Sequence, residues 1–396
     1  MRIFPSLPAV AMVIVAAIQP ASALEAQGLP EPAGIMADVE RVADWQIAHL
    51  DKIDYVDLYR EETENPTGWV QGTLFLGLSE LADRSGEARY ADAILRHDRM
   101  TGWSLSGPAE HADYQLIGQT YFWEYRRSQD SHAIEAIVHR FDEVLAEHPD
   151  GSLDFGGDPL PNGSRPCQKR WCWSDALFMA PATWATASQV TGDPRYLAYA
   201  DQEVWAVTQK LYDPEEHLFY RDSLQMGKRD AEGNKIFWSR GNGWVLAGLA
   251  RFLSALPPDH PSRGRYEALF KTMAQRVTQL QTAGGTWSPS LLSRAQDGPP
   301  ETSGTALFLY GLAWGVNHGL LDPADTMPVL IRGWSALSTA IRPDGRLGWV
   351  QKIGYAPAQV SADDTQLYGT GALLLAGTEL SRLSEKQAAA RSHPAR

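Results

Sequence analysis

Residues 167–179 read CQKRWCWSDALFM, and this stretch indicates how the chain folds. Cys167 and Cys172 frame its first half, and Asp175 stands where an apolar helical run begins. An Asp at a helix start can cap the helix, because its carboxylate accepts the free N–H groups of the first turn and faces the positive end of the helix dipole. Held beside the indoles of Trp171 and Trp173, the same carboxyl is also a candidate catalytic acid.

Five other stretches have the same character, an aromatic or polar cluster followed by a segment rich in Gly, Ala and Leu. They read NPTGWVQG, EHADYQLIG, WSRGNGWVLAG, PETSGTALF and SADDTQLYGTGALLLAG. The separations between successive clusters are 44, 62, 65, 63 and 63 residues, with markers at Trp69, Asp113, Asp175, Arg240, Ser303 and Gln366. The chain therefore contains a loose internal repeat of helix pairs.

Apolar residues recur with helical spacing through most of the chain, and strand-like alternation is scarce. The pattern predicts an all-α fold of twelve helices, over 32–50, 67–84, 87–100, 114–127, 131–147, 175–190, 193–210, 241–255, 264–281, 303–318, 322–340 and 366–385. The even-numbered helices are apolar and are expected inside, whereas the more charged odd-numbered ones are expected outside. If the six inner helices run parallel in a ring, all six clusters meet at one end. Six helix N-termini there favour an anion, such as an acidic sugar.

The N-terminal sequence MRIFPSLPAVAMVIVAAIQPASALEAQ has a basic start, an apolar core and small residues before polar sequence. Residues 1–23 are therefore predicted to be a secretory signal peptide, cleaved after Ala23. The apolar core is shorter than the ~20 residues of a membrane span. We expect a secreted or periplasmic protein. No Pro-, Ser- or Gly-rich linker divides the rest, which predicts one domain over 24–385 and a flexible tail over 386–396.

Composition excludes several classes of function. The formal charge is 35 − 48 = −13 without a basic run, which argues against nucleic acid and anionic membranes as partners. A Gly-rich phosphate loop, a nucleophile elbow and a paired-histidine zinc motif are all missing from the sequence, so no cofactor or metal is expected. Cys167 and Cys172 suit a disulfide in an oxidising compartment, where it would brace a short loop. A metal site is the alternative, but further ligands are not nearby. Asp363 and Asp364 are interpreted as a cap for the last helix, with calcium binding as the alternative.

Two carboxyls are the best candidates for catalysis. Asp113 and Asp175 could act on one sugar as general acid and base, and an Asp among tryptophans should have a raised pKa. The simpler interpretation is that each caps a helix. Arg240, in WSRGNGW, and Arg221, in HLFYRD, are candidate cations for a carboxylate ligand, because Arg binds carboxylates bidentately. Arg240 could instead close a loop through carbonyl contacts.

Aromatic residues are abundant, with 14 Trp and 14 Tyr. Indole faces suit the apolar faces of pyranose rings, and Trp69, Trp173, Trp238 and Trp244 precede or begin inner helices. The alternative is that a large helical domain buries them in its core. His111 and His217 lie near the clusters, but a lone His is more often structural.

The motifs WSRGNGW, SDALFMAP, ADYQLIGQTY, ETSGTALFLYGLAWG and LYGTGALLLAGTEL resemble those of glycoside hydrolase family 105, the unsaturated rhamnogalacturonyl hydrolases, which are related to the unsaturated glucuronyl hydrolases of family 88. The resemblance runs from about Trp45 to Leu380. It implies an (α/α)6 barrel, in agreement with the helix pattern. It also implies a substrate with a non-reducing terminal uronic acid that carries a double bond between C4 and C5.

The resemblance gives roles to single residues. Asp175 matches the acid that protonates C4 and then activates water for attack on C5, so the hydrated ring opens and releases the neighbouring sugar. Asp113 matches the second family Asp, which holds ring hydroxyls. Arg240 and Trp244 match substrate contacts, and we expect Asn242 to be a further one. Trp69, Trp173 and Trp238 are expected to complete the binding surface.

One position departs from the family pattern. Many relatives have a His where this chain has Arg221. A permanent cation cannot shuttle protons, but it can bind a uronate carboxylate or a sulfate on the next sugar. The leading hypothesis is hydrolysis of an unsaturated galacturonyl-rhamnose from pectin. The alternatives are unsaturated glucuronyl disaccharides from sulfated ulvan or glycosaminoglycans, an inverting glycosidase that uses Asp113 and Asp175, and a carbohydrate-binding relative without activity.

Overall fold

The protein is an (α/α)6 barrel, as predicted. A computed structural model describes residues 28–56, 58–147, 149–160, 165–293 and 300–392. The inner ring is formed by α4 (Trp69–Ser85), α6 (Gly118–Ser128), α8 (Ala176–Met179) with α9 (Pro181–Thr191), α11 (Ser239–Ala255), α13 (Thr302–Asn317) and α15 (Leu367–Ser392). Each inner helix packs against the next, and α15 packs against α4 to close the ring.

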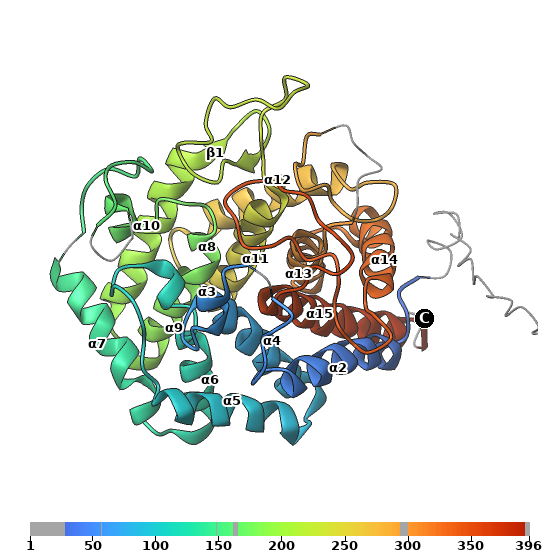
Figure 1. Ribbon diagram of the computed structural model, residues 1–396, viewed down its shortest axis with the longest axis horizontal. Helices are drawn as coiled ribbons and strands as arrows, with labels where there is room; N and C mark the ends of the chain where they lie inside the picture. The colour runs from blue at the N-terminus through green and yellow to red at the C-terminus, as the bar shows by residue number, and fades with distance from the viewer. Residues whose placement is uncertain (1–27, 57, 148, 161–164, 294–299, 393–396) are drawn as a thin grey trace, which may run out of the picture.

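The outer layer covers this ring, as Figure 1 shows. It consists of α2 (Pro32–Ala48), α5 (Ala88–Thr101), α7 (His132–Glu147), α10 (Pro194–Leu211), α12 (Arg263–Gln279) and α14 (Pro323–Thr339). The first outer helix, α2, packs on the last inner helix, α15, so the two ends of the described chain lie in the same helix pair. The inner and outer assignment made from charge and apolar content is confirmed.

Small residues let the inner helices approach closely. A Cβ atom at Gly371 in α15 would lie 2.2 Å from the carbonyl oxygen of Thr73 in α4, so the two backbones are in contact there. Gly77 of α4 makes the reciprocal approach, since its Cβ would lie 2.6 Å from the carbonyl oxygen of Gly371. The Gly-rich character of these helices in the sequence is therefore explained by packing.

Three helix predictions differ from the structure. The helix predicted over 175–190 is two helices, because Pro181 has no N–H to continue α8 and instead begins α9. The helix predicted from residue 114 begins at Gly118, after the 3₁₀ turn η1 (Ala112–Tyr114). The last helix continues to Ser392, so most of the segment predicted as a tail is helical.

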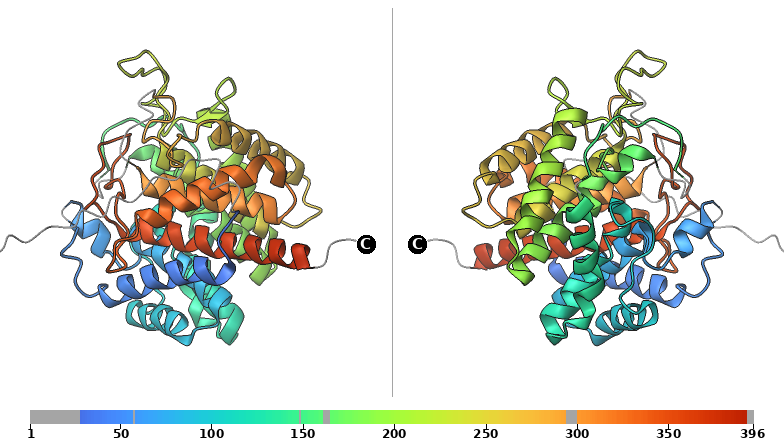
Figure 2. Two further views of the ribbon diagram at one scale, coloured as in Figure 1. Left: turned by 90° about the vertical axis from the view of Figure 1, so that its right-hand side faces the viewer. Right: turned by 90° about the vertical axis from the view of Figure 1, so that its left-hand side faces the viewer.

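The sequence pattern missed three short elements: α3 (Arg60–Glu64), the 3₁₀ turn η2 (Pro166–Lys169), and an antiparallel hairpin of β1 (Tyr212–Asp213) and β2 (Leu218–Phe219). In Figure 2, α3 and the loop before α15 lie at one end of the barrel, and the last turns of α15 project at the other. We call the first end the cluster end and the second the far end.

The predicted disulfide between Cys167 and Cys172 is present. It closes the turn that leads to α8. The predicted signal peptide, residues 1–23, lies outside the described residues. Among the helices that the structure describes, none is both long enough and apolar enough to cross a membrane.

Candidate active site

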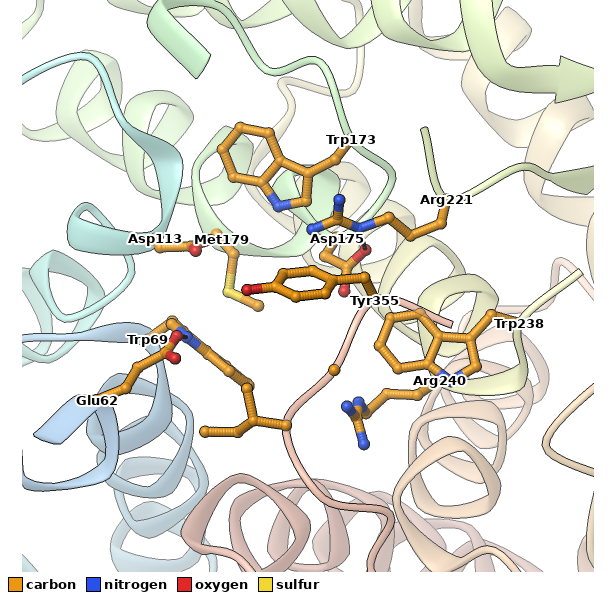
Figure 3. Close-up of a pocket in the computed structure, with 12 residues that line it drawn as sticks. Glu62, Trp69, Asp113, Trp173, Asp175, Met179, Arg221, Trp238, Arg240 and Tyr355 are labelled. Atoms are coloured by element: carbon orange, nitrogen blue, oxygen red, sulfur yellow. Dashed lines mark hydrogen bonds and ion pairs between the residues drawn. The ribbon is translucent and has the colours of Figure 1, made fainter. Parts of the chain in front are cut away.

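Seven of the residues that the sequence analysis singled out meet in one pocket at the cluster end (Figure 3): Trp69, Asp113, Trp173, Asp175, Arg221, Trp238 and Arg240. Its walls are Glu62, Trp69, Asp113, Trp173, Asp175, Met179, Arg221, Trp238, Arg240, Ile353, Gly354 and Tyr355. The cavity volume is about 50 Å³, which holds only a few water molecules. Tyr355, at 56% exposed, is the most exposed of the wall residues.

Asp175 is buried at the start of α8, but it does not cap this helix. Its Oδ2 accepts a hydrogen bond from Ser174 Oγ at 3.0 Å and lies 3.8 Å from Arg221 Nε. Burial raises its pKa, and the positive charges of Arg221 and Arg240 oppose that rise. The capping interpretation is therefore wrong for this side chain. The result is a carboxyl that keeps its proton to a higher pH than an exposed Asp.

Asp113 lies inside the 3₁₀ turn η1 rather than at a helix cap. The cap of this turn is His111, whose Nδ1 accepts the backbone N–H of Asp113 at 3.3 Å. Burial raises the pKa of Asp113 well above its usual value, and repulsion by Glu62 and Asp175 adds to the effect. The two aspartates thus share one pocket, and Asp113 is the more strongly favoured in its neutral form.

Arg221 is brought to the pocket by the β-hairpin. Its carbonyl oxygen accepts the N–H of Ser174 at 2.8 Å, which fixes the hairpin beside Asp175. Its Nη1 donates to Asp222 at 2.7 Å, and its guanidinium lies 4.9 Å from the ring of Phe155 and 5.1 Å from that of Tyr355. The side chain is 8% exposed, and Nε is buried without a hydrogen-bond partner among the described residues. Arg221 therefore offers an unused donor beside the catalytic candidate.

Arg240 closes a loop, which was the simpler of the two interpretations offered for it. Its Nη1 and Nη2 donate to the carbonyl oxygens of Gln351 and Lys352, at 2.5 and 3.0 Å. Its guanidinium also stacks on Trp238, with 4.4 Å between Cζ and the ring. The side chain still lines the pocket and contributes its charge to Asp175. Two of its three nitrogens are thus occupied.

The loop that Arg240 holds, residues 349–356, forms one wall of the pocket, and we call it the strap. Gln351 is its anchor: Oε1 accepts the indole N–H of Trp238 at 3.0 Å, and Nε2 donates to the carbonyl oxygen of Ala356 at 2.9 Å. Its backbone N–H donates to Glu301, the cap of α13, at 3.3 Å. The strap brings Ile353, Gly354 and Tyr355 to the pocket.

Two of the expected substrate contacts, Asn242 and Trp244, do not line the pocket. Asn242 is 1% exposed and does not line the pocket. Its Oδ1 accepts the N–H of Phe219 at 2.8 Å and its Nδ2 donates to the carbonyl of the same residue at 3.0 Å, so it fastens strand β2 to α11. Trp244 is also 1% exposed and packs below the pocket against Phe178, 4.7 Å between ring centres. Both residues support the elements that carry the pocket residues without lining the pocket themselves.

Three of the predicted tryptophans do line the pocket: Trp69, Trp173 and Trp238. Trp69 donates its indole N–H to Glu62 Oε1 at 2.5 Å. Glu62 and Tyr355 were missed from the sequence, because one lies on the short helix α3 and the other on the strap, and neither segment has a periodic pattern. The only sequence signal for these two pocket residues was their type, since each is an acidic or aromatic residue in a long connection between helices.

The remaining candidates are structural. His111 is buried against Trp173, 4.9 Å between ring centres, and burial together with Arg221 lowers its pKa to about 4, so it is neutral. His217 bonds to the hydroxyl of Tyr212 at 2.9 Å. Asp363 pairs with Arg342, and Asp364 pairs with Lys352 at 3.4 Å. Within the described residues, His, Cys, Asp and Glu side chains form no group of three or more that could hold a metal ion.

A helical barrel with buried carboxyls, tryptophans and arginines at one end is an architecture suited to acidic carbohydrates, and comparison with known proteins gives the family. Residues 38–384 match the model of Glycosyl Hydrolase Family 88. The chain is 38% identical to an unsaturated 3S-rhamnoglycuronyl hydrolase of Alteromonas sp. (strain LOR), over 86% of this chain and 84% of the relative. It is 37% identical to a protein of the same name from Formosa agariphila, over 81% and 86%.

A solved structure supports the same family. A family 88 glycosyl hydrolase from Bacteroides vulgatus is 27% identical and superposes with a TM-score of 0.76, covering 89% of this chain and 99% of that one. The chain belongs to Glycosyl Hydrolase Family 88. It is a glycoside hydrolase, in the family that the sequence motifs indicated as related.

Proposed function

We propose that the protein removes a terminal Δ4,5-unsaturated uronic acid from a short saccharide by hydrating the C4=C5 bond, with Asp175 as general acid and base. The observation that carries the proposal is the buried carboxyl of Asp175, which has a raised pKa and faces a pocket that also holds Arg221. One group with a pKa raised toward working pH is sufficient for this chemistry.

The reaction divides into balanced steps. Protonated Asp175 gives its proton to C4, the double bond is lost, and positive charge develops at C5 and the ring oxygen. The Asp175 carboxylate then takes a proton from water as the water oxygen bonds to C5. The hemiketal so formed opens by breaking the bond between C5 and the ring oxygen, and the hemiacetal left at C1 releases the neighbouring sugar. Asp175 ends the cycle protonated, as it began.

Asp113 has a supporting role in this proposal. Burial raises its pKa well above the usual value, so its carboxyl keeps its proton to higher pH than an exposed Asp, and in that form it can donate a hydrogen bond to a ring hydroxyl. Two ionised carboxylates in one buried pocket would repel each other and the uronate. A neutral Asp113 avoids this repulsion.

Arg221 is the proposed contact for the substrate's acidic group. The Nε atom is buried without a partner among the described residues, and the planar guanidinium is held between two aromatic rings. A uronate carboxylate or a sulfate would supply the missing acceptor.

The names of the relatives support a choice of substrate. Both relatives at 37–38% identity are named as 3S-rhamnoglycuronyl hydrolases. We therefore propose that the substrate carries an unsaturated glycuronyl group linked to rhamnose. The galacturonyl-rhamnose of the leading hypothesis and the glucuronyl disaccharides of the alternative are both compared in the test below. We also propose that the protein is exported, on the basis of the N-terminal sequence.

The test is a panel of lyase-generated unsaturated disaccharides, followed by the ultraviolet absorbance of the conjugated double bond. Loss of absorbance together with release of the second sugar is the expected result. The variant Asp175→Asn should fold normally and lose about 100- to 10,000-fold in turnover. Cleavage of saturated saccharides with the chromophore intact would instead support an inverting glycosidase. Binding without turnover would support a carbohydrate-binding relative.

A further inference from the structure

The far end of the barrel contains a second pocket, which the chemistry above does not use. Its volume is about 310 Å³. All six inner helices contribute to its walls, through side chains that include Glu80, Arg126, Thr186, Arg251, Tyr310 and Arg382. Arg251 follows Arg240 on α11 by eleven residues, so it lies roughly 16 Å further along the same helix. The second pocket is therefore separate from the first.

Arginines outnumber carboxylates in this pocket. Glu80 bonds to both Arg251 and Arg382, each at 3.2 Å, and Arg382 also bonds to Glu379 at 2.7 Å. The charges of these two glutamates and two arginines neutralise one another. Arg126 is exposed to solvent, and its guanidinium makes no hydrogen bond and no ion pair with any residue that the structure describes. With three arginines and two glutamates, the pocket carries an excess of one positive charge.

A second observation points to a missing acceptor. Gln119 is 6% exposed, and its Oε1 accepts a hydrogen bond from Arg251 Nε at 2.9 Å. Because Oε1 is the atom that faces Arg251, the other polar atom of the amide, the donor Nε2, points away from Arg251. Nε2 is buried and has no partner among the described residues. An unsatisfied buried amide N–H is unfavourable, and an acceptor bound in the pocket would remove the penalty.

Arginines near the last turns of the inner helices also interact favourably with the helix dipoles. That interaction explains the positive charge, but it does not use directional donors. It leaves unexplained why Gln119 Nε2, on a side chain that lines the same pocket, is buried without a partner among the described residues. A ligand with oxygen acceptors and negative charge would accept from this amide and balance the excess positive charge.

We propose that the far-end pocket binds an oxyanion, a carboxylate or a sulfate group, through Arg126, Arg251 and Gln119. Inorganic sulfate and an acidic sugar share this chemistry, and the volume accommodates either. The pocket lies between all six inner helices, so an occupant would add to the contacts that Arg251 already makes across the ring with Glu80 and Gln119. Bound ligand should therefore raise the unfolding temperature.

The test uses the full chain at constant ionic strength, with sodium sulfate, glucuronate and glucose as probes, each measured by calorimetric titration and by thermal unfolding. Arg126→Gln removes the unpaired guanidinium. Arg127→Gln is the matched control, since Arg127 is the next residue on α6 but pairs with Asp83 at 3.1 Å outside the pocket. We expect sulfate or glucuronate to bind the natural chain and Arg127→Gln equally, and Arg126→Gln at least about 10-fold more weakly. Hydrolytic turnover without added anion should be unchanged in both variants.

The outcomes also identify the source of the oxyanion. Tighter binding of glucuronate than of sulfate supports an acidic sugar, and the reverse supports a free inorganic anion. Equal binding to Arg126→Gln and Arg127→Gln would overturn the proposal, as would the absence of binding at millimolar probe. Binding that is lost in Arg221→Gln but kept in Arg126→Gln would place the anion in the catalytic pocket. Glucose binding as tightly as glucuronate would also overturn the proposal, because a neutral sugar needs no arginine.

Discussion

The charge of Arg221 should set the alkaline limit of the hydrolase, and replacement by Gln tests this. Arg221→Gln removes a positive charge 3.8 Å from Asp175 Oδ2 while a side-chain amide remains to bond with Asp222. Arg221 opposes the burial that raises the pKa of Asp175. Without the cation this pKa rises further, so Asp175 keeps its proton to higher pH. The alkaline limb of the pH profile of kcat/KM should therefore move to higher pH.

The size of the effect follows from the distance. At 3.8 Å, two unit charges attract with roughly 4 kcal/mol if the effective dielectric constant is about 20. Asp222, 2.7 Å from Arg221, shares the same cation, so this figure is an upper bound. Solvent screening is small, because the two side chains are only 8% and 12% exposed. Each ~1.4 kcal/mol of lost attraction moves the limb by about one pH unit.

The assay is the pH dependence of kcat/KM, measured by loss of chromophore absorbance. Arg221→Lys is the control, because it retains the charge and removes the planar fork. The limb should stay in place in Arg221→Lys and move upward in Arg221→Gln, while KM for the acidic disaccharide rises in both. An unchanged limb in Arg221→Gln would refute the reasoning, since Asp175 would then not be the proton donor or would not sense Arg221.

Three further changes test the architecture around the site. Gln351→Leu should raise KM several-fold without moving the pH limb, because the strap loses its side-chain anchor but no charge near Asp175 changes; a shifted limb would contradict this positioning role. The double variant Cys167→Ser/Cys172→Ser opens a loop with a sequence separation of 5. Its free energy of unfolding, measured by urea titration, should fall by roughly 2 kcal/mol. The natural chain with its disulfide reduced should show the same loss. Gly371→Ala should cost about 1–3 kcal/mol or more in the same assay, whereas Gly264→Ala, at a helical position with open space around it, should be neutral or stabilising; equal effects would disprove the proposed contact between α4 and α15.

The layered fold could be predicted because its signal is local. Helical periodicity, glycines and charge separate inner from outer helices without knowledge of their partners. The break at Pro181 follows from a proline that the sequence shows, although helical periodicity alone continues through it. The late start of α6 depends on the turn η1, which the periodic pattern does not place. The β-hairpin has only two residues in each strand, too few for an alternating pattern.

The candidate site was predictable only where it belongs to the repeat. Asp175 and Arg240 begin or immediately precede inner helices, so the ring brings them together. Successive helical residues turn by about 100°, which directs Asn242 away from the pocket and places Trp244 one turn below Arg240. The motif WSRGNGW alone does not show which of Arg240, Asn242 and Trp244 lines the pocket. Glu62 reaches the pocket from an outer connection whose path depends on tertiary contacts.

The charges of the candidate catalytic pocket would couple binding of the proposed substrate to protonation of the pocket. Glu62, Asp113 and Asp175 would carry three negative charges if all were ionised, against two positive charges from Arg221 and Arg240. An ionised pocket would therefore repel a uronate, and the protein can accept its proposed substrate only when a carboxyl is neutral. Burial favours this condition, since it raises the pKa of both aspartates.

The same shifts affect stability with a definite sign. The folded state holds these two protons to higher pH than the unfolded chain does, so the stability they contribute is complete below the ordinary pKa of Asp and is lost as pH rises through the raised values. A bound uronate adds negative charge and raises both pKa values further. Substrate binding should therefore be accompanied by the uptake of a proton, and this expectation follows from the same burial and charge that support Asp175 as the proposed acid.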